Sequence, residues 1–387
     1  MKTASAQPAR HWLDAWHVDP STNRNYDFID GLRGIAILMV LVSHAVYSDK
    51  QTSFLGQYFM GFAHTFGEGV ALFFTLSGFL IALPFWKRKV KGTQPLLPPG
   101  YGWRRFWKIY PPLALSVLFF GVYYLIWGGD APLFLRAMLQ WLTGAAFLMP
   151  VSGRFNPVMW SLVVEIHFYL ALPLLFLATR RFSARACLAI ITLCLFAIPL
   201  SLQMLTGREP SILPSIVDPY GTGLSQFCFG VGLAGVDVMQ LWNPRWSRLA
   251  DVGWLAILLA LLGEGWLNVN PDAHPLILLY LFRWLFLAGA GCLLCYATAP
   301  ESPRARWLCA PWLRWFGIIS YELYLFHQPM LGWARGGFGP AHGNLLKYAV
   351  ILAVPLLLSI TFSATIYRWF SLPILRRGRA RKSAAKG

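Results

Sequence analysis

The sequence predicts an all-α protein, a polytopic transmembrane helical bundle of about ten spans with both termini in the cytoplasm. Hydrophobic residues make up 57% of its 387 residues and charged residues 13%, and the mean hydropathy is +0.52. Soluble domains carry about 25% charged residues, so the composition excludes a soluble enzyme. Apolar stretches of about 20 residues, the length that crosses a bilayer, recur along the chain. They do not show the short alternating segments of a membrane β-barrel.

Ten stretches are long enough to be spans. They lie near residues 33–50, 67–86, 108–128, 158–178, 186–206, 219–240, 250–267, 275–298, 315–334 and 344–371. We expect residues 1–28 to form a cytoplasmic amino-terminal arm, residues 29–373 the membrane domain, and residues 374–387 a disordered basic tail in the cytoplasm. The arm is polar and lacks the apolar core of a signal peptide, so the first span is expected to be an uncleaved anchor.

The charge excess is expected to report topology rather than nucleic-acid binding. The chain carries 33 Lys and Arg against 16 Asp and Glu, a formal net charge of +17. With ten spans and a cytoplasmic amino terminus, 25 of the basic residues fall on the cytoplasmic side and six on the other side. Arg283 and Arg368 fall within helices. Basic residues concentrate in cytoplasmic loops of membrane proteins, so this orientation is predicted and no nucleic-acid partner is expected.

The first span carries two ionisable side chains, which are costly inside a membrane and are therefore candidates for function. In DGLRGIAILMVLVSHA, Arg33 stands at the cytoplasmic mouth and His44 follows eleven residues later, roughly 16 Å deeper at 1.5 Å per residue. Eleven residues are close to three turns, so both side chains face one direction. The pair suits an anionic cofactor whose reactive end reaches inward. The alternative is a snorkelling arginine and a hydrogen-bonded core histidine.

The fourth predicted span, WSLVVEIHFYLALP, contains Glu165 and His167. These residues are two apart, so they lie on different faces of a helix and are not expected to share one pocket. A buried carboxylate at Glu165 could orient an imidazole or bind an acceptor hydroxyl. A hydrogen bond that packs two helices is the alternative for Glu165, and the favoured interpretation of His167.

The ninth predicted span, FGIISYELYLFHQPM, contains Ser320, Glu322 and His327. Measured from residue 315, His327 is expected roughly 18 Å deep, similar to His44 or slightly beyond it. A kink is expected after it, at Pro329, because proline cannot donate the helical hydrogen bond. Functional and structural roles for these three residues are equally compatible with the sequence.

Two further positions carry basic residues whose role can be interpreted in two ways. Arg104, Arg105 and Lys108 lie in WRRFWKIYPP at the entrance to the third span. Arginines at a helix start can bind phosphates, or they can be cytoplasmic anchors. Arg283 lies within the eighth span, where it either snorkels to the interface or forms an ion pair with Glu264 or another buried acid.

No metal site is predicted. The six cysteines lie in or beside apolar runs, and the C-x-x-C formed by Cys292 and Cys295 has no second pair. Structural zinc sites ordinarily combine four such ligands. We therefore expect these cysteines to be buried side chains of membrane helices.

Five of these stretches, in this order, resemble motifs of the acyltransferase 3 family of integral membrane O-acyltransferases. Arg33 and His44 match a first-helix signature of a basic residue, ten residues and a histidine. FFTLSGFLI, RRFWKIYP, WSLVVEIHFYLALP and GIISYELYLFHQP resemble the later motifs, and the resemblance covers residues 26–373. Two positions depart from the pattern. Ser371 stands where an acidic residue is usual, and Lys108 stands where arginine is commoner.

The resemblance implies a multi-pass protein of a bacterial-type cytoplasmic membrane. It implies transfer of an acyl group, commonly acetyl, from cytoplasmic acyl-coenzyme A as donor co-substrate to a hydroxyl of an extracytoplasmic carbohydrate or small molecule. No bound cofactor is expected. Acceptor identity, acyl length, oligomeric state and the choice between direct transfer and an acyl-enzyme are left open.

The residues can be given roles in such a transfer as a hypothesis. Arg33, helped by Arg104, Arg105 and Lys108, is expected to hold the donor phosphates. His44 is the expected general base, with Glu165 orienting it. Ser320, Glu322 and His327 are expected to contact substrate or to support the site. The rival hypothesis is a proton-coupled transporter or flippase, since buried Glu and His also suit that function.

Overall fold

A computed structural model describes residues 12–17, 27–45, 54–126, 129–143, 156, 158–194, 214–241, 248–270, 276–297, 303–338 and 345–384. Every regular element in these ranges is helical, which confirms the predicted all-α class. The helices are α1 (Asp27–Ala45), α2 (Phe54–Thr65), α3 (Gly69–Val90), α4 (Tyr101–Ile126), α5 (Ala131–Thr143), α6 (Met159–Ala178), α8 (Pro214–Val238), α9 (Leu249–Val269), α10 (Leu276–Ala297), α11 (Pro311–Phe338), α12 (Leu345–Ile366) and α13 (Leu372–Ala384).

Seven helical segments of the described chain are long and apolar enough to cross a membrane. They are Asp27–Ala45, Phe59–Val90, Tyr101–Ile126, Met159–Ala178, Leu249–Val269, Leu278–Tyr296 and Val350–Gly378. The chain is therefore a polytopic membrane protein. The other three predicted spans overlap α8, α11 and a short apolar helix, Ala184–Cys194. The sequence count of ten spans stays a prediction.

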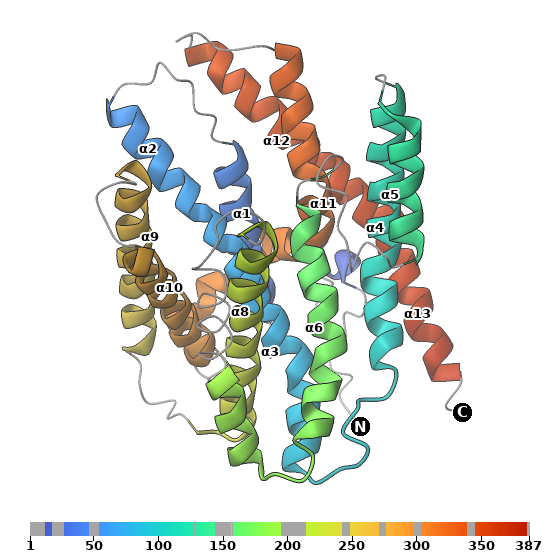
Figure 1. Cartoon of the computed structure of the whole chain (residues 1–387), viewed down its shortest axis with the longest axis vertical. Coiled ribbons are helices and arrows are strands. Elements are labelled where there is room, and N and C mark those ends of the chain that lie inside the picture. Colours follow the sequence, from blue (N-terminus) through green and yellow to red (C-terminus); the bar gives the residue numbers. More distant parts are fainter. Residues whose placement is uncertain are drawn as a thin grey trace, which may run out of the picture.

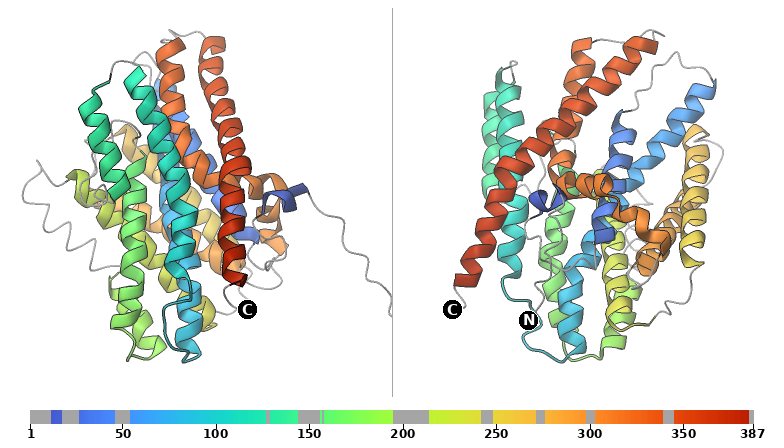
Figure 2. Two further views of the ribbon diagram at one scale, coloured as in Figure 1. Left: turned by 90° about the vertical axis from the view of Figure 1, so that its right-hand side faces the viewer. Right: turned by 180° about the vertical axis from the view of Figure 1, so that it is seen from behind.

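The helices are arranged as a central group flanked on two sides (Figure 1). Helices α1, α3, α6, α8 and α11 occupy the centre. Helices α2, α9 and α10 lie on one side, and α4, α5, α12 and α13 lie on the other, as the views in Figure 2 also show. The most extensive helix pairs are α3 with α8, α1 with α11 and α9 with α10.

Large apolar side chains cover the outward faces of the flanking helices. On α9, Leu255, Leu258 and Leu262 are each at least half exposed, and on α12, Leu357 and Leu358 are more exposed still. Such a surface is unfavourable in water but matches lipid tails. The helix faces that point inward are therefore the ones that can hold polar chemistry.

The backbones of helices α1 and α11 are in direct contact. A Cβ atom at Gly317 of α11 would lie 1.8 Å from the carbonyl oxygen of Asp30, and one at Gly34 of α1 would lie 2.1 Å from that of Leu313. Only glycine permits this approach, as is common where small residues bring membrane helices together. We call this contact the α1–α11 seam.

Helices α3 and α8 form a second close pair. A Cβ atom at Gly78 would lie 2.3 Å from the carbonyl oxygen of Phe227, and one at Gly230 would lie 2.0 Å from that of Thr75. The indole Nε1 of Trp86 also donates to the carbonyl oxygen of Val231, at 2.8 Å. Gly78 and Gly230 thus permit the close contact between the two helices.

Segments near the two ends of the chain pack against each other. The short 3₁₀ helix Trp12–Trp16 places the ring of Trp16 parallel to that of Tyr367, with centroids 6.2 Å apart. The Tyr367 hydroxyl donates to the carbonyl oxygen of Trp16 at 2.9 Å, and Arg376 Nη2 donates to that of His17 at 2.9 Å. The amino-terminal 3₁₀ helix is therefore held against the junction between α12 and α13.

The expectation of a disordered carboxyl-terminal tail is wrong for residues up to Ala384. Residues Leu372–Ala384 form α13, which continues from α12 through a π-helical turn, Tyr367–Ser371. Leucine, arginine, lysine and alanine all have high helix propensity, so a helix that begins in the membrane can extend into this basic segment.

The α1–α11 seam predicts a stability difference between two glycines of the same helix. Gly317→Ala places a methyl group against the backbone of α1, and we expect a loss of about 1–3 kcal/mol or more from overpacking. Gly332→Ala is the matched control, because a Cβ atom there meets nothing within 4 Å. The measurement is the thermal unfolding midpoint in detergent. Equal midpoints for the two variants would contradict the seam.

Candidate active site

The α1–α11 seam positions Arg33. Its Nη2 atom donates to the Ser320 hydroxyl at 2.9 Å, and its Nε atom donates to the carbonyl oxygen of Gly317 at 3.4 Å. The guanidinium also lies over the ring of Phe73, 5.7 Å from the centroid. These contacts confine a long side chain to one direction, which saves conformational entropy when an anion binds.

Arg33 lines a small hollow that we call the basic cavity, with a volume of about 60 Å³. Its charged lining residues are Arg33, Arg105, Lys108 and Glu165. Three cations from α1 and α4 thus face one carboxylate from α6. The cavity has room for about two water molecules, so it can hold the end of a ligand but not a whole nucleotide.

Glu165 belongs to the basic cavity and has its own hydrogen-bond partners there. It accepts a hydrogen bond from the Ser77 hydroxyl at 3.0 Å and another from the Tyr169 hydroxyl, one helical turn along α6. Arg105 lies over the Tyr169 ring, 5.9 Å from its centroid. Glu165 and Tyr169 therefore anchor the wall of the basic cavity that faces the three cations.

His44 and His327 form a pair across the α1–α11 seam. The Nδ1 atom of His44 lies 2.8 Å from Nε2 of His327, and the ring centroids are 5.0 Å apart. His327 is fully buried, and its Nδ1 atom lies 2.9 Å from the carbonyl oxygen of Tyr324 and 3.1 Å from that of Leu323. The two histidines that were expected at similar depth are thus in direct contact.

This geometry assigns the protons of the pair. A carbonyl oxygen can only accept, so Nδ1 of His327 carries the hydrogen, and Nε2 of the neutral ring is an acceptor. The 2.8 Å contact then requires the hydrogen on Nδ1 of His44. In a neutral His44 the lone pair is consequently on Nε2, the atom that can take a proton from a substrate.

His44 lines a second and larger hollow, which we call the histidine cavity, with a volume of about 360 Å³. Its polar lining residues are His44, His64, Glu68, Gln226, Glu264, Arg283 and Gln328. The basic cavity and the histidine cavity share Val70, Phe74 and Tyr324 as wall residues. They therefore lie on opposite sides of one thin wall.

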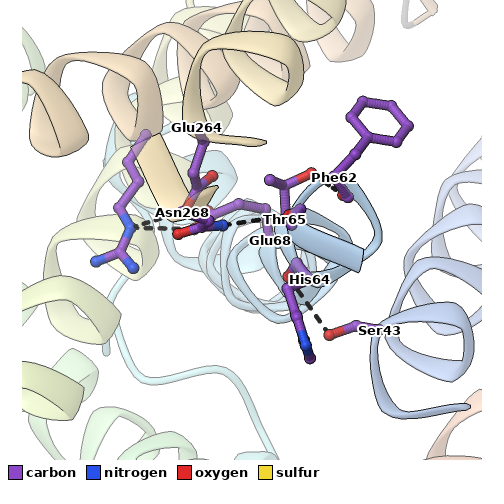
Figure 3. A network of polar contacts seen from close by, with 9 residues as sticks. Ser43, Phe62, His64, Thr65, Glu68, Glu264 and Asn268 are labelled. Atoms are coloured by element: carbon purple, nitrogen blue, oxygen red, sulfur yellow. Dashed lines mark hydrogen bonds and ion pairs between the residues drawn. The ribbon is translucent and has the colours of Figure 1, made fainter. Parts of the chain in front are cut away.

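Arg283 forms ion pairs rather than snorkelling. Its Nε atom lies 3.3 Å from Glu68 Oε1 and 3.5 Å from Glu264 Oε1. Figure 3 shows Glu68 and Glu264 close together, beside Asn268, whose side-chain Nδ2 donates to the carbonyl oxygen of Gly61 at 3.4 Å. Two buried carboxylates thus share one guanidinium at the edge of the histidine cavity.

Three of the residues expected at the site line neither cavity, namely Arg104, Glu322 and His327, and of these His327 contacts the cavity residue His44. Arg104 donates from Nη1 to the carbonyl oxygen of Pro99 at 2.6 Å, and Glu322 is buried, at 3% exposure. Neither is among the residues that line the two cavities. Adjacent positions on a helix differ by about 100° in direction, so Arg104 and its neighbour Arg105 cannot both face the basic cavity.

Sequence reasoning missed Glu68 and Tyr324. Glu68 lies on a 3₁₀ turn, Phe66–Glu68, directly before α3, where an acidic residue is ordinary. Tyr324 separates the two cavities and its hydroxyl contacts the Ser161 hydroxyl at 2.7 Å. Glu264 and Arg283 stood out as charges inside predicted spans, whereas Glu68 is the second residue of the predicted span 67–86 and resembled an ordinary charge at a span end.

The described residues contain no group of three or more His, Cys, Asp or Glu side chains that could hold a metal ion. The chemistry available in this part of the chain is that of imidazole, carboxylate, hydroxyl and guanidinium groups. An imidazole whose Nδ1 hydrogen is directed at a neighbouring ring, as in His44, carries its lone pair on Nε2 and is suited to general base catalysis.

Comparison with known proteins points to acyl transfer. The chain is 26% identical to the peptidoglycan O-acetyltransferase OatA of Listeria monocytogenes over 78% of its own length and 49% of that protein. It is 25% identical to the putative peptidoglycan O-acetyltransferase YrhL of Bacillus subtilis, over 90% of the chain and 55% of that protein. It thus spans about half the length of these two relatives.

A third relative has a more similar length. The putative membrane-bound transacylase BcsY of Komagataeibacter xylinus is 25% identical, over 87% of the chain and 81% of that protein. No solved structure matches the chain significantly. The model of the acyltransferase domain called acyltransferase 3 matches residues 26–367, nearly the whole membrane bundle. The chain therefore belongs to the acyltransferase 3 family of membrane acyltransferases, whose O-acetyltransferase members it resembles.

Proposed function

We propose that the protein transfers an acetyl group from coenzyme A to a hydroxyl of an extracytoplasmic carbohydrate, with His44 as the general base. The observation that carries this proposal is the shared wall between the basic cavity and the histidine cavity, beside His44. An anionic donor and a polar acceptor can occupy the two sides and meet at one imidazole. The O-acetyltransferase relatives support acetyl as the group and carbohydrate as the acceptor.

The orientation follows from the positive charges. Ten spans with a cytoplasmic amino terminus place the loop from Lys87 to Lys108 in the cytoplasm, and the basic cavity lies next to this loop. The histidine cavity then faces the opposite side of the membrane.

Arg33, Arg105 and Lys108 hold the donor phosphates in this proposal. The basic cavity is too small for the nucleotide, which stays at the cytoplasmic mouth with its phosphates against the cations. The pantetheine arm then extends along α1 toward His44, over the roughly 16 Å that separates positions 33 and 44 on a helix. Arg104 lies outside the cavity and contributes only to the charge of the mouth.

The reaction step is a single acyl transfer. His44 Nε2 takes the proton of the acceptor hydroxyl while the hydroxyl oxygen bonds to the carbonyl carbon of the acetyl thioester. The carbon–sulfur bond then breaks, and the coenzyme A thiolate leaves with the proton from His44. His327 holds His44 in the tautomer that this step needs, a role expected for Glu165 from the sequence. Glu165 instead organises the donor side through Ser77 and Tyr169.

Removal of the base predicts loss of transfer. We expect His44→Ala to reduce acetylation of acceptor by about 10²–10⁴-fold, the usual contribution of a general base. The assay follows labelled acetyl groups from acetyl-coenzyme A to carbohydrate in membranes containing equal amounts of inserted protein. His167→Ala is the matched control, since His167 lies on α6 and lines neither cavity. Unchanged acetyl transfer by the His44→Ala variant would contradict the role of His44 as general base.

The histidine pair predicts a separate effect at His327. We expect His327→Leu to lower kcat about tenfold or more and to leave the KM for acetyl-coenzyme A unchanged, because tautomer and orientation are lost but the donor site is intact. His327→Gln restores an acceptor near the position of Nε2 and should recover part of the lost kcat. Equal activity of the Leu and Gln variants would show that His327 has a packing role alone.

The basic cavity predicts how strongly donor binding depends on charge. We expect Arg105→Gln to weaken equilibrium binding of coenzyme A by about 10–100-fold, the loss that follows removal of a charge-assisted hydrogen bond. Arg136→Gln is the control, because Arg136 is exposed on α5. Binding is measured with labelled coenzyme A on protein in lipid nanodiscs. Equal binding by both variants would place the donor elsewhere.

A further inference from the structure

His64 is an ionisable side chain that the proposed acyl transfer does not use. It lies in the last turn of α2, within the apolar helical segment Phe59–Val90. Ionisable side chains in such segments are costly and are therefore candidates for function. The predicted span 67–86 begins after His64, so the spacing of the spans does not mark it. The structure places this histidine beside the proposed base.

His64 lines the histidine cavity together with His44. The hydroxyl of Ser43, the residue before His44, donates to the backbone carbonyl oxygen of His64 at 3.5 Å, which holds the end of α2 against α1. The side chain of His64 is exposed. Figure 3 shows its ring directed away from Glu264 and Asn268. Two imidazoles from different helices therefore face one hollow.

The histidine cavity is large enough for a sugar unit. Its volume of about 360 Å³ lies within the range of small-molecule sites, about 300–1,000 Å³. Trp160 of α6 and Phe74 of α3 form an aromatic part of the lining, with their rings edge to face and their centroids 6.3 Å apart. In such sites the apolar lining provides contact area, and a few polar groups fix the orientation of the ligand.

The polar groups of the lining match hydroxyl groups. Arg283 forms ion pairs with both Glu68 and Glu264, so these three charges are engaged with one another. The lining also contains four imidazole and amide side chains: His44, His64, Gln226 and Gln328. A neutral imidazole and an amide each have a donor and an acceptor, as a hydroxyl group does. An ionised carboxylate or phosphate could only accept from them.

We propose that His64 determines which hydroxyl of the acceptor is acylated, by forming a hydrogen bond with a second hydroxyl of the same sugar while the reacting hydroxyl lies at Nε2 of His44. This inference rests on the proposed acyl transfer, which supplies the base and the reacting hydroxyl. A sugar carries several similar hydroxyl groups, so a single contact at His44 does not select among them. A second contact at His64 selects one orientation of the sugar. His64 forms no covalent bond in this role.

The test compares acetyl transfer by His64→Leu and by the wild type in nanodiscs. The acceptor is envelope polysaccharide from cells that contain the protein, freed of esters with mild alkali, and the donor is labelled acetyl-coenzyme A. We expect the KM for polysaccharide to rise about 3–10-fold, as follows from the loss of one neutral hydrogen bond, with the KM for acetyl-coenzyme A unchanged. NMR of the product should show acetyl groups spread over more hydroxyl positions than with the wild type.

Two further variants separate a hydrogen bond from packing. His64→Gln keeps a donor and an acceptor, so it should recover part of the affinity and of the positional selectivity. His167→Leu is the matched control, since His167 lines neither cavity and should behave as the wild type.

Three results would overturn the role of His64. They are an unchanged polysaccharide KM and product in His64→Leu, equal behaviour of the Leu and Gln variants, and a raised KM for acetyl-coenzyme A in His64→Leu, which would indicate a disturbed fold. Absence of acetyl transfer by the wild type would instead contradict the proposed acyl transfer, and the role of His64 with it.

Discussion

Contact between the backbones of α1 and α11 is the constraint on which the whole candidate site depends. Each half of the site is a bond across this seam, Arg33 to Ser320 on one side of the dividing wall and His44 to His327 on the other. Lipid tails are as apolar as the helix surfaces, so burial contributes little to holding membrane helices together. Close backbone packing at Gly34 and Gly317 holds α1 and α11 together instead. At this distance, the side chains of serine and histidine are long enough to form contacts between the two helices.

The charged side chains that line the two cavities differ in sign. The three cations Arg33, Arg105 and Lys108 gather around the basic cavity, whereas Glu68 and Glu264 line the histidine cavity together with Arg283. His44 lies between the two sets with its Nδ1 already engaged. In the proposed acyl transfer, a donor and an acceptor come together from two sides of a bilayer. A division of charge at the site of transfer gives each side a different selectivity.

The His44–His327 pair and the ion pairs of Arg283 show how buried polar side chains are held in place here. His327 is fully buried and faces backbone carbonyl oxygens, so its proton positions are set by groups that cannot change. Glu68 is held by Arg283 at one oxygen and left unsatisfied at the other.

The sequence by itself determined the all-helical membrane class and, through five ordered motifs, the family. It also showed which ionisable side chains lie inside the predicted spans. Those properties depend on local composition and spacing, which a single chain displays directly. Only the tertiary structure decided the partners. It joined His44 to His327 rather than to Glu165, placed Arg105 but not Arg104 in the basic cavity, and brought Glu68 to Arg283. The direction of a side chain around a helix and the packing of distant helices decide such contacts, and neither can be read from spacing along one segment.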